Sequence, residues 1–346
     1  MKGLIFMAER IGYHTIILPS KPSVYGYASV VGKAESEGPL ADEFDKTYDE
    51  DTIGGCPTWE KAESAIHKEA VTRAIAKADL SPAEIDLIMA GDLLNQCIGT
   101  SFGIRELEIP FLGLYGACST MALSLGLASV LVDSCVVNTA VASTSSHFAS
   151  AERQFRLPLE YGGQRPPSAQ RTATASGATV ISHHKGKSPS IEAVIFGKIM
   201  DFGIKDANNM GAAMAPAAAD TIQNFLADTE TRPSDYDLIL TGDLGKVGSE
   251  LLIELLIKDH NIDISTVHND CGLMIYDLKK QDMHAGGSGC GCSAAVLNSL
   301  IMKKLTTGEL KKVLFVGTGA LLSTTSSLQG ESVPGIAHGV LLTNGE

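Results

Sequence analysis

Cys118 stands in a Gly-Ala-Cys-Ser turn, after a short apolar segment at residues 109–115 and before an apolar stretch from Thr120 to Val132. The first segment predicts a strand and the second a helix. Backbone N–H groups and the positive end of a helix dipole favour a thiolate at such a junction. We therefore expect Cys118 to act as a nucleophile or to lie beside a bound anion; the alternative is a small buried side chain.

Other polar residues with possible binding roles follow in the same half of the chain. Ser145, Ser146 and His147 are expected just past a strand, where hydroxyl groups and an imidazole could line a pocket; the alternative is a solvated loop histidine. Arg153 and Arg156 carry guanidinium groups with the geometry that carboxylates need, and otherwise form surface ion pairs.

Asp92 and Asp243 each follow a predicted strand in a Gly-Asp pair, where a carboxylate caps a helix or binds a cation. A glycine-rich turn around Ser288 would let the backbone approach a ligand or an opposing helix. Zinc binding by Cys290, Cys292 and His284 has weak support, because one C-x-C lacks a second paired motif. No metal site is predicted.

The chain contains an internal repeat. Residues 81–93 return as residues 232–244, with Pro, Asp, Leu-Ile and Gly-Asp-Leu in register, and residues 116–123 are matched by residues 290–297. The repeating unit is far longer than the roughly 20–50 residues of a solenoid repeat. The sequence therefore predicts two similar domains packed against each other.

Strands and helices are predicted to alternate in both halves, which favours a mainly parallel sheet with helices on its faces. The helix from Thr120 is apolar on nearly every side, so it should lie between layers. The segment from Thr144 to Asp220, rich in small residues, is predicted to be a long irregular cap or dimer contact. In the first half the predicted elements are helices at 59–78 and 120–132 and strands at 86–90, 109–115 and 135–142.

The composition excludes several classes of protein. The 346 residues include 27 Lys and Arg against 40 Asp and Glu, a formal charge of −13 without a basic cluster, which argues against a nucleic-acid partner. Seven cysteines without a disulfide framework, and no signal peptide, predict reduced thiols and synthesis in the cytoplasm. The stretch from Ile11 to Val31 is too interrupted to span a bilayer.

The duplicated pattern, with a cysteine at the head of a buried helix and a glycine-rich turn opposite it, resembles the thiolase and ketoacyl synthase fold. This resemblance implies a five-layer αβαβα sandwich with halves at 1–180, including a cap from about residue 144, and 181–346. A more specific resemblance is to the stage V sporulation protein AD family. It rests on ordered blocks at residues 37–40, 44–48, 90–96, 116–120, 144–147, 151–156, 160–164, 213–221 and 286–290.

The family resemblance implies a protein that binds dipicolinic acid (pyridine-2,6-dicarboxylate), alone or with calcium, during its uptake into the developing spore. It also implies a peripheral location on the inner spore membrane through other stage V sporulation A membrane proteins. A homodimer would form through the strand near 135–142, as in enzymes of this fold. No cofactor is expected, although calcium could enter with the ligand; Asp92, Asp220 and Asp243 are too scattered to make a calcium loop.

The resemblance also implies binding without turnover. Condensing enzymes of this fold pair their cysteine with a His, or with His and Asn, from the second half, whereas this chain has Asp243 and Ser288 there. An aspartate beside a thiol raises the pKa of the thiol. The expected ligand site is the vestigial cleft, lined by Cys118, Ser145, Ser146, His147, Arg153 or Arg156, Asp243 and Ser288. The rival hypotheses are an acyl-transfer enzyme with Cys118 as nucleophile and His147 as base, and a dimeric scaffold for membrane partners.

Overall fold

The computed structural model describes residues 8–155, 165–183 and 188–345. Ten of the described strands form one continuous hydrogen-bonded order. This order consists of two groups of the same design, which meet where Ser23 pairs with Ser190. The first group has the order β3 (Ser23–Val31), β9 (Ala175–Ser182), β7 (Thr139–Ser146), β5 (Leu87–Gly91) and β6 (Phe111–Gly113). The second has the order β10 (Ser190–Phe196), β15 (Gly335–Thr343), β14 (Lys312–Ala320), β11 (Leu238–Thr241) and β12 (His268–Asp270).

The pairing pattern is the same in both groups. The first three strands of each run antiparallel to their neighbours, and the last three run parallel. The duplication seen in the sequence is therefore a duplication of sheet topology. The predicted division between residues 180 and 181 stays a prediction; β9 ends at Ser182 and β10 begins at Ser190.

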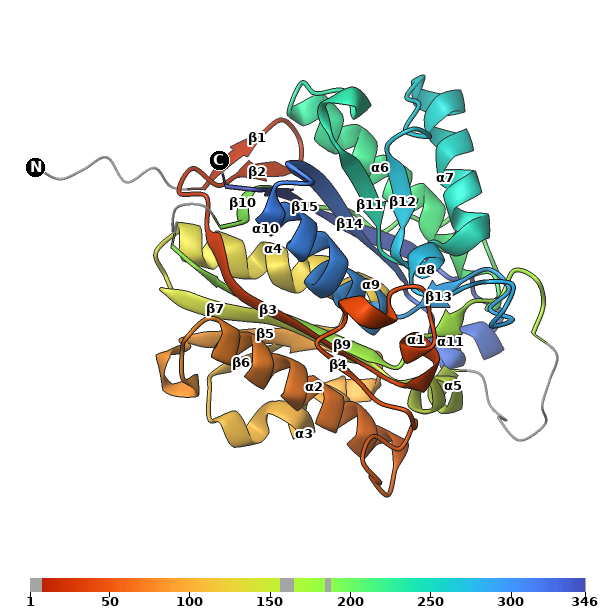
Figure 1. Ribbon diagram of the computed structural model, residues 1–346. Coiled ribbons are helices and arrows are strands. Elements are labelled where there is room, and N and C mark those ends of the chain that lie inside the picture. The colour runs from red at the N-terminus through yellow and green to blue at the C-terminus, as the bar shows by residue number, and fades with distance from the viewer. Residues whose placement is uncertain (1–7, 156–164, 184–187, 346) are drawn as a thin grey trace, which may run out of the picture.

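Helices cover both outer faces of the sheets and fill the space between them (Figure 1). Helices α2 (Trp59–Lys77) and α3 (Ile98–Ile104) lie outside the first sheet, and α6 (Met210–Asp228) and α7 (Gly245–His260) lie outside the second. Between the sheets lie α4 (Thr120–Asp133), α9 (Cys290–Val296) and α10 (Met302–Thr307), the last two joined by a π-helical turn. The predicted five-layer α/β sandwich is confirmed.

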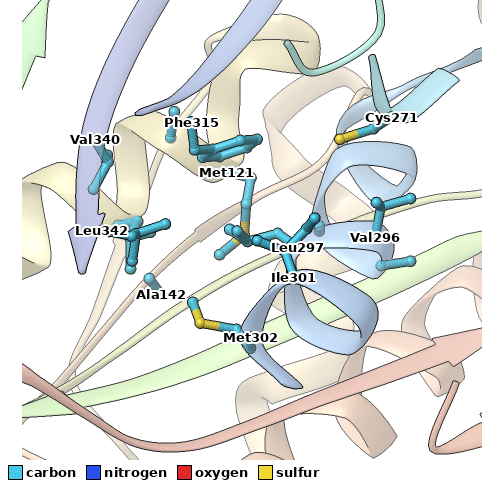
Figure 2. Packing of buried hydrophobic residues seen from close by; sticks show 14 of the residues in the cluster. Met121, Ala142, Cys271, Val296, Leu297, Ile301, Met302, Phe315, Val340 and Leu342 are labelled. Atoms are coloured by element: carbon cyan, nitrogen blue, oxygen red, sulfur yellow. The ribbon is translucent and has the colours of Figure 1, made fainter. Parts of the chain in front are cut away.

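The central layer forms the largest hydrophobic core. Figure 2 shows Met121 from α4, Leu297 from the π-helical turn and Phe315 from β14 pointing toward one another. All three side chains are fully buried, and the burial of Met121 is expected because α4 has no polar face. Removing such a side chain leaves a cavity and costs about 2–5 kcal/mol. This packing holds the start of α4, and with it Cys118, in a fixed position.

Two predictions about the first half are wrong. β7 begins at Thr139 and not at Cys135, because residues 134–138 form the turn that ends α4, with Cys135 at a φ of 55°. β7 also pairs with β5 on one side and β9 on the other, so it offers no free edge for the dimer contact predicted near 135–142. The free edge of the first sheet is β6.

The segment from Thr144 to Asp220 is also more regular than predicted. It holds the end of β7, α5 (Phe148–Phe155), β8 (Arg171–Thr172), β9, β10 and the first half of α6. Small residues make this possible, because they let elements approach closely. A Cβ atom at Gly177 in β9 would lie 2.3 Å from the carbonyl oxygen of Ala294 in α9.

The remaining elements are short, and one pair of them ties the two halves together. β1 (Glu9–Ile11) and β2 (Thr15–Ile17) form a hairpin that pairs with β10, so the beginning of the described chain joins the second sheet. None of the described helices has both the length and the apolar character needed to cross a bilayer. The other short elements are α1 (Lys33–Ser36), β4 (Lys46–Thr47), α8 (Cys271–Met274), β13 (Gly287–Ser288) and α11 (Thr324–Leu328).

Candidate functional site

A cavity of about 340 Å³ lies where the two halves meet, with Cys118 and Ser288 in its wall. Residues of α5, which follows β7, and of α11, which follows β14, line this cavity. Because β7 and β14 are equivalent strands of the two halves, equivalent segments of the repeat form these two walls. Most of the lining is apolar or uncharged. Its size falls within the range of pockets that enclose small ligands.

Cys118 lies in the turn that leads into α4 and is buried. Its sulfur is 4.0 Å from the hydroxyl oxygen of Ser288. Burial raises the pKa of the Cys118 thiol well above its usual value of 9.0, and the neighbouring carboxylate of Asp243 raises it further. The thiol is therefore neutral at pH 7, the opposite of an activated nucleophile.

Asp243 lies beneath Ser288, at the end of the connection that follows β11. Its carboxylate accepts hydrogen bonds from the Ser288 hydroxyl (3.1 Å), the Gly289 amide (2.8 Å) and the Thr318 hydroxyl (2.9 Å). Burial is the main cause that raises the pKa of Asp243 to about 6. The sequence correctly predicted that an aspartate would raise the pKa of the cysteine.

His147 lies outside this cavity. Its Nε2 donates a hydrogen bond to the carbonyl oxygen of Asp51 (2.8 Å), and its Nδ1 accepts one from the Ala149 amide (3.1 Å). Burial lowers the pKa of His147 below its usual value. Both ring nitrogens are thus occupied, and the imidazole is not placed to take a proton from Cys118.

Ser145 and Ser146 are also not among the described residues that line the cavity. The Ser145 hydroxyl lies 3.2 Å from Nδ1 of His67 and 3.3 Å from a carboxylate oxygen of Glu63, both on α2. The Ser146 hydroxyl donates to the carbonyl oxygen of Ala173 (2.7 Å). Since these residues belong to β7 and not to a loop, their side chains are fixed between the sheet and its neighbours.

The predicted arginines do not supply a cation to this cavity in the described part of the chain. Arg153 forms an ion pair with Glu60 and lines a second cavity next to Trp59. Arg156 lies outside the described residues. The described lining of the first cavity contains the carboxyl group of Glu152 but no Lys, Arg or His. Among the described lining residues, a free dianion would meet no positive side chain.

The three carboxylates considered for calcium are far from forming one site. The Asp92 carboxylate accepts hydrogen bonds from the amides of Leu94 and of Thr100 in the first turn of α3, although Asp92 is not the N-cap residue of that helix. Asp220 pairs with Lys198 at 2.9 Å. In the described ranges, no group of three or more His, Cys, Asp and Glu side chains could hold a metal ion.

Sequence reasoning missed a buried network behind the cavity. Glu63 accepts hydrogen bonds from Ser150 (2.7 Å) and Ser145 (3.3 Å), while Nε2 of His67 lies 2.9 Å from the Ser143 hydroxyl. Burial, with a contribution from the charge of Asp92, raises the pKa of Glu63 well above its usual value. The signal was available, since Glu63 and His67 flank the apolar positions of α2 at helical spacing.

Comparisons with known proteins agree with this architecture. The family model of stage V sporulation protein AD matches residues 12–343. A curated relative, stage V sporulation protein AD of Bacillus subtilis (strain 168), is 48% identical over 330 residues, which cover 95% of this chain and 96% of the relative.

Solved structures of similar fold are enzymes. The 3-oxoacyl-[acyl-carrier-protein] synthase III from Aquifex aeolicus VF5 has a TM-score of 0.57 and 14% identity, covering 93% of this chain and 99% of its own. A single-residue variant of OleA from Xanthomonas campestris has a TM-score of 0.58 and 13% identity, covering 93% of this chain and 98% of its own. At these identities the likeness shows the fold alone.

Proposed function

Because the chain belongs to the stage V sporulation protein AD family, we propose that it binds dipicolinic acid in the cavity beside Cys118 and catalyses no reaction on it. The observation that carries the proposal is that Cys118 lies beside Asp243, whose carboxylate raises the pKa of the thiol, while the described lining of the cavity contains no histidine. Burial and this carboxylate raise the pKa of the thiol, so the nucleophile of a condensing enzyme is lacking while its pocket is retained.

The charge of the described part of the cavity lining supports binding of the ligand as its calcium complex. Dipicolinate carries two negative charges, and the described lining offers the carboxyl group of Glu152, with Asp243 behind it, and no basic side chain. One Ca²⁺ ion cancels the charge of one dipicolinate, and the flat neutral complex then suits a mostly apolar slot. Calcium in this proposal is part of the ligand, held by the carboxylates of dipicolinate.

Calorimetric titration of the purified chain with dipicolinate, with and without calcium, tests the proposal. We expect saturable binding that is at least tenfold tighter with calcium and absent with phthalate. Ala320→Leu fills the wall of the cavity from β14 and should abolish this heat, whereas Ala227→Leu on the exposed face of α6 should preserve it. Equal heats from wild type and Ala320→Leu would place the ligand elsewhere.

The rival enzyme hypothesis makes an opposite prediction about Cys118. An acyl-transfer enzyme would form a thioester at this sulfur, visible as a mass increase of the intact protein after incubation with acyl-CoA. We expect no such increase. An adduct that disappears in Cys118→Ala would establish transfer chemistry and overturn the proposal.

The protein is further proposed to act in dipicolinate uptake as a homodimer held at the inner spore membrane by other stage V sporulation A membrane proteins. The dimer contact is assigned to the edge strand β6. Leu112 in β6 and Tyr115 just after it are 48% and 54% exposed, and two further apolar side chains, Ile98 and Phe102, are 42% and 52% exposed on α3. Two such edges can pair across a two-fold axis.

Sedimentation velocity tests the dimer. Leu112→Lys places a charge in the centre of the proposed contact and should yield monomers. Leu328→Lys is the matched control, because Leu328 is 89% exposed but belongs to α11 of the second half and not to β6. Monomeric wild-type protein, or a dimer unaffected by Leu112→Lys, would refute this part of the proposal.

A further inference from the structure

A second cavity, of about 370 Å³, lies on the other side of α5 from the first. It is lined by Thr52, Cys56, Pro57, Thr58, Trp59 and Arg153. Along α5, Glu152, Gln154 and Phe155 line the first cavity, and Arg153 lines the second. The helix therefore separates two pockets whose walls carry different chemistry.

Local contacts hold the indole of Trp59 and the loop opposite it in place. Trp59 is the first residue of α2, and the side chain of Thr58 caps this helix by accepting a hydrogen bond from the Lys61 amide. The His147 ring lies 5.5 Å from the Trp59 ring at an angle of 31°. Through its hydrogen bond to the Asp51 carbonyl, His147 also anchors the loop that forms the far wall.

The lining combines an aromatic face with a guanidinium group. Arg153 pairs with Glu60 through one nitrogen, Nη2, and an arginine has five N–H donors, so this pairing does not exhaust it. The first turn of α2 adds the positive end of a helix dipole. A tryptophan ring stacks with flat aromatic ligands, and a guanidinium group binds carboxylates.

We propose that this cavity is a second ligand site, for a flat aromatic carboxylate that stacks on Trp59 and places its carboxylate against Arg153. His147 is a positioning residue here, since it supports the indole and fixes the loop without touching the ligand. The ligand class follows from Trp59 and Arg153, so the inference does not depend on what occupies the cavity beside Cys118.

The fluorescence of Trp59 reports directly on this cavity, because it is the only tryptophan in the chain. Picolinate is the titrated probe. Trp59 is excited at the red edge of its absorption band, so that absorbance by picolinate does not interfere. We expect saturable quenching by picolinate and at least tenfold weaker apparent affinity for cyclohexanecarboxylate, which has the charge without the aromatic face. Pyridine, which has the ring without the charge, should also bind at least tenfold more weakly.

Substitutions separate this site from the first cavity. Arg153→Met should weaken picolinate binding at least tenfold, and Arg153→Lys, which keeps the charge but not the fork, should give an intermediate loss. Arg73→Met is the matched control, because Arg73 pairs with Glu69 on the same helix α2 and lines neither cavity. Ala320→Leu should leave the quenching unchanged.

Three results would overturn the inference: no saturable quenching, quenching that survives Arg153→Met, or quenching that is lost in Ala320→Leu. Failure of the proposed function would look different. In that case the calorimetric heat assigned to the first cavity would be missing, or unaffected by Ala320→Leu, whatever the fluorescence of Trp59 shows.

Discussion

Replacing Asp243 by asparagine should change how the stability of the protein depends on pH. The pKa of Asp243 is raised to about 6 from an ordinary value of 3.8, mainly by burial. Because this group binds its proton more tightly in the folded chain, its contribution to stability is complete below pH 3.8 and is lost as the pH rises through about 6. Ionisation of Asp243 thus opposes folding at neutral pH.

The magnitude follows from the difference of about two pKa units, each worth ~1.4 kcal/mol, so the loss is ~3 kcal/mol. Asparagine keeps the shape of aspartate and does not ionise. The free energy of unfolding of Asp243→Asn, relative to wild type, should therefore rise by ~3 kcal/mol between about pH 4 and about pH 7. A lost or rearranged hydrogen bond to Thr318 would add a constant offset of ~1 kcal/mol.

Urea denaturation of both proteins across this range measures the difference. Titration of Glu63 occurs in both chains and cancels in the comparison. The charge of Asp270 also raises the pKa of Asp243, so the measured difference includes the coupling between these two carboxyl groups. Asp228→Asn is a control for which the stability difference should depend on pH in the opposite direction. Burial acts to raise the pKa of Asp228, but hydrogen bonds donated by Tyr13, His14 and Thr15 hold the pKa below its usual value. Its contribution is therefore present above pH 3.8 and lost as the pH falls. A pH-independent difference for Asp243→Asn would refute the reasoning.

Three further predictions concern reactivity and packing. Iodoacetamide should label the exposed Cys135 well before the buried Cys118, and Asp243→Asn should speed labelling of Cys118 because the neighbouring charge is removed. Peptide mass spectrometry measures both labelling rates. Faster labelling of Cys118 than of Cys135 in the wild-type protein would contradict the account. Gly211→Ala should lower the free energy of unfolding by about 1–3 kcal/mol in urea titrations, because the new Cβ would lie 2.6 Å from the Leu244 carbonyl oxygen. An unchanged midpoint of urea unfolding would show that α6 and α7 separate easily. Met121→Ala should cost about 2–5 kcal/mol in the same assay, and a cost below ~1 kcal/mol would mean that the central layer repacks.

The fold was predictable because its main signals are local and repeated. The Gly-Asp-Leu repeat marks the ends of equivalent parallel strands, and the apolar helix from Thr120 has to lie between layers. Patterns of this kind do not show which sheet a short strand joins. The pairing of strand β2 therefore escaped prediction, because its partner β10 lies far along the chain.

The site was predictable only in part. Cys118, Asp243 and Ser288 come together because each belongs to a turn at equivalent ends of the two halves. The prediction for Ser145 and Ser146 failed because β7 runs four residues further than expected, which turns both hydroxyl groups into buried contacts of a strand. Side-chain direction in a strand depends on register, and a short apolar run does not fix register.

His147 and Arg153 show a second limit of sequence reasoning. Both residues follow β7 closely, so the sequence placed them in one pocket with Cys118. The side chains of adjacent residues on α5 in fact line different cavities, because a helix turns by about 100° per residue. Their separation becomes visible only once α5 is placed between the two cavities.

A crystal structure of the protein grown with calcium and dipicolinate would test the central claim most directly. The account predicts density for an intact calcium–dipicolinate complex in the cavity lined by Cys118 and Ser288, with an unmodified sulfur on Cys118. A ligand seated only beside Trp59, or a covalent group on the Cys118 sulfur, would contradict it.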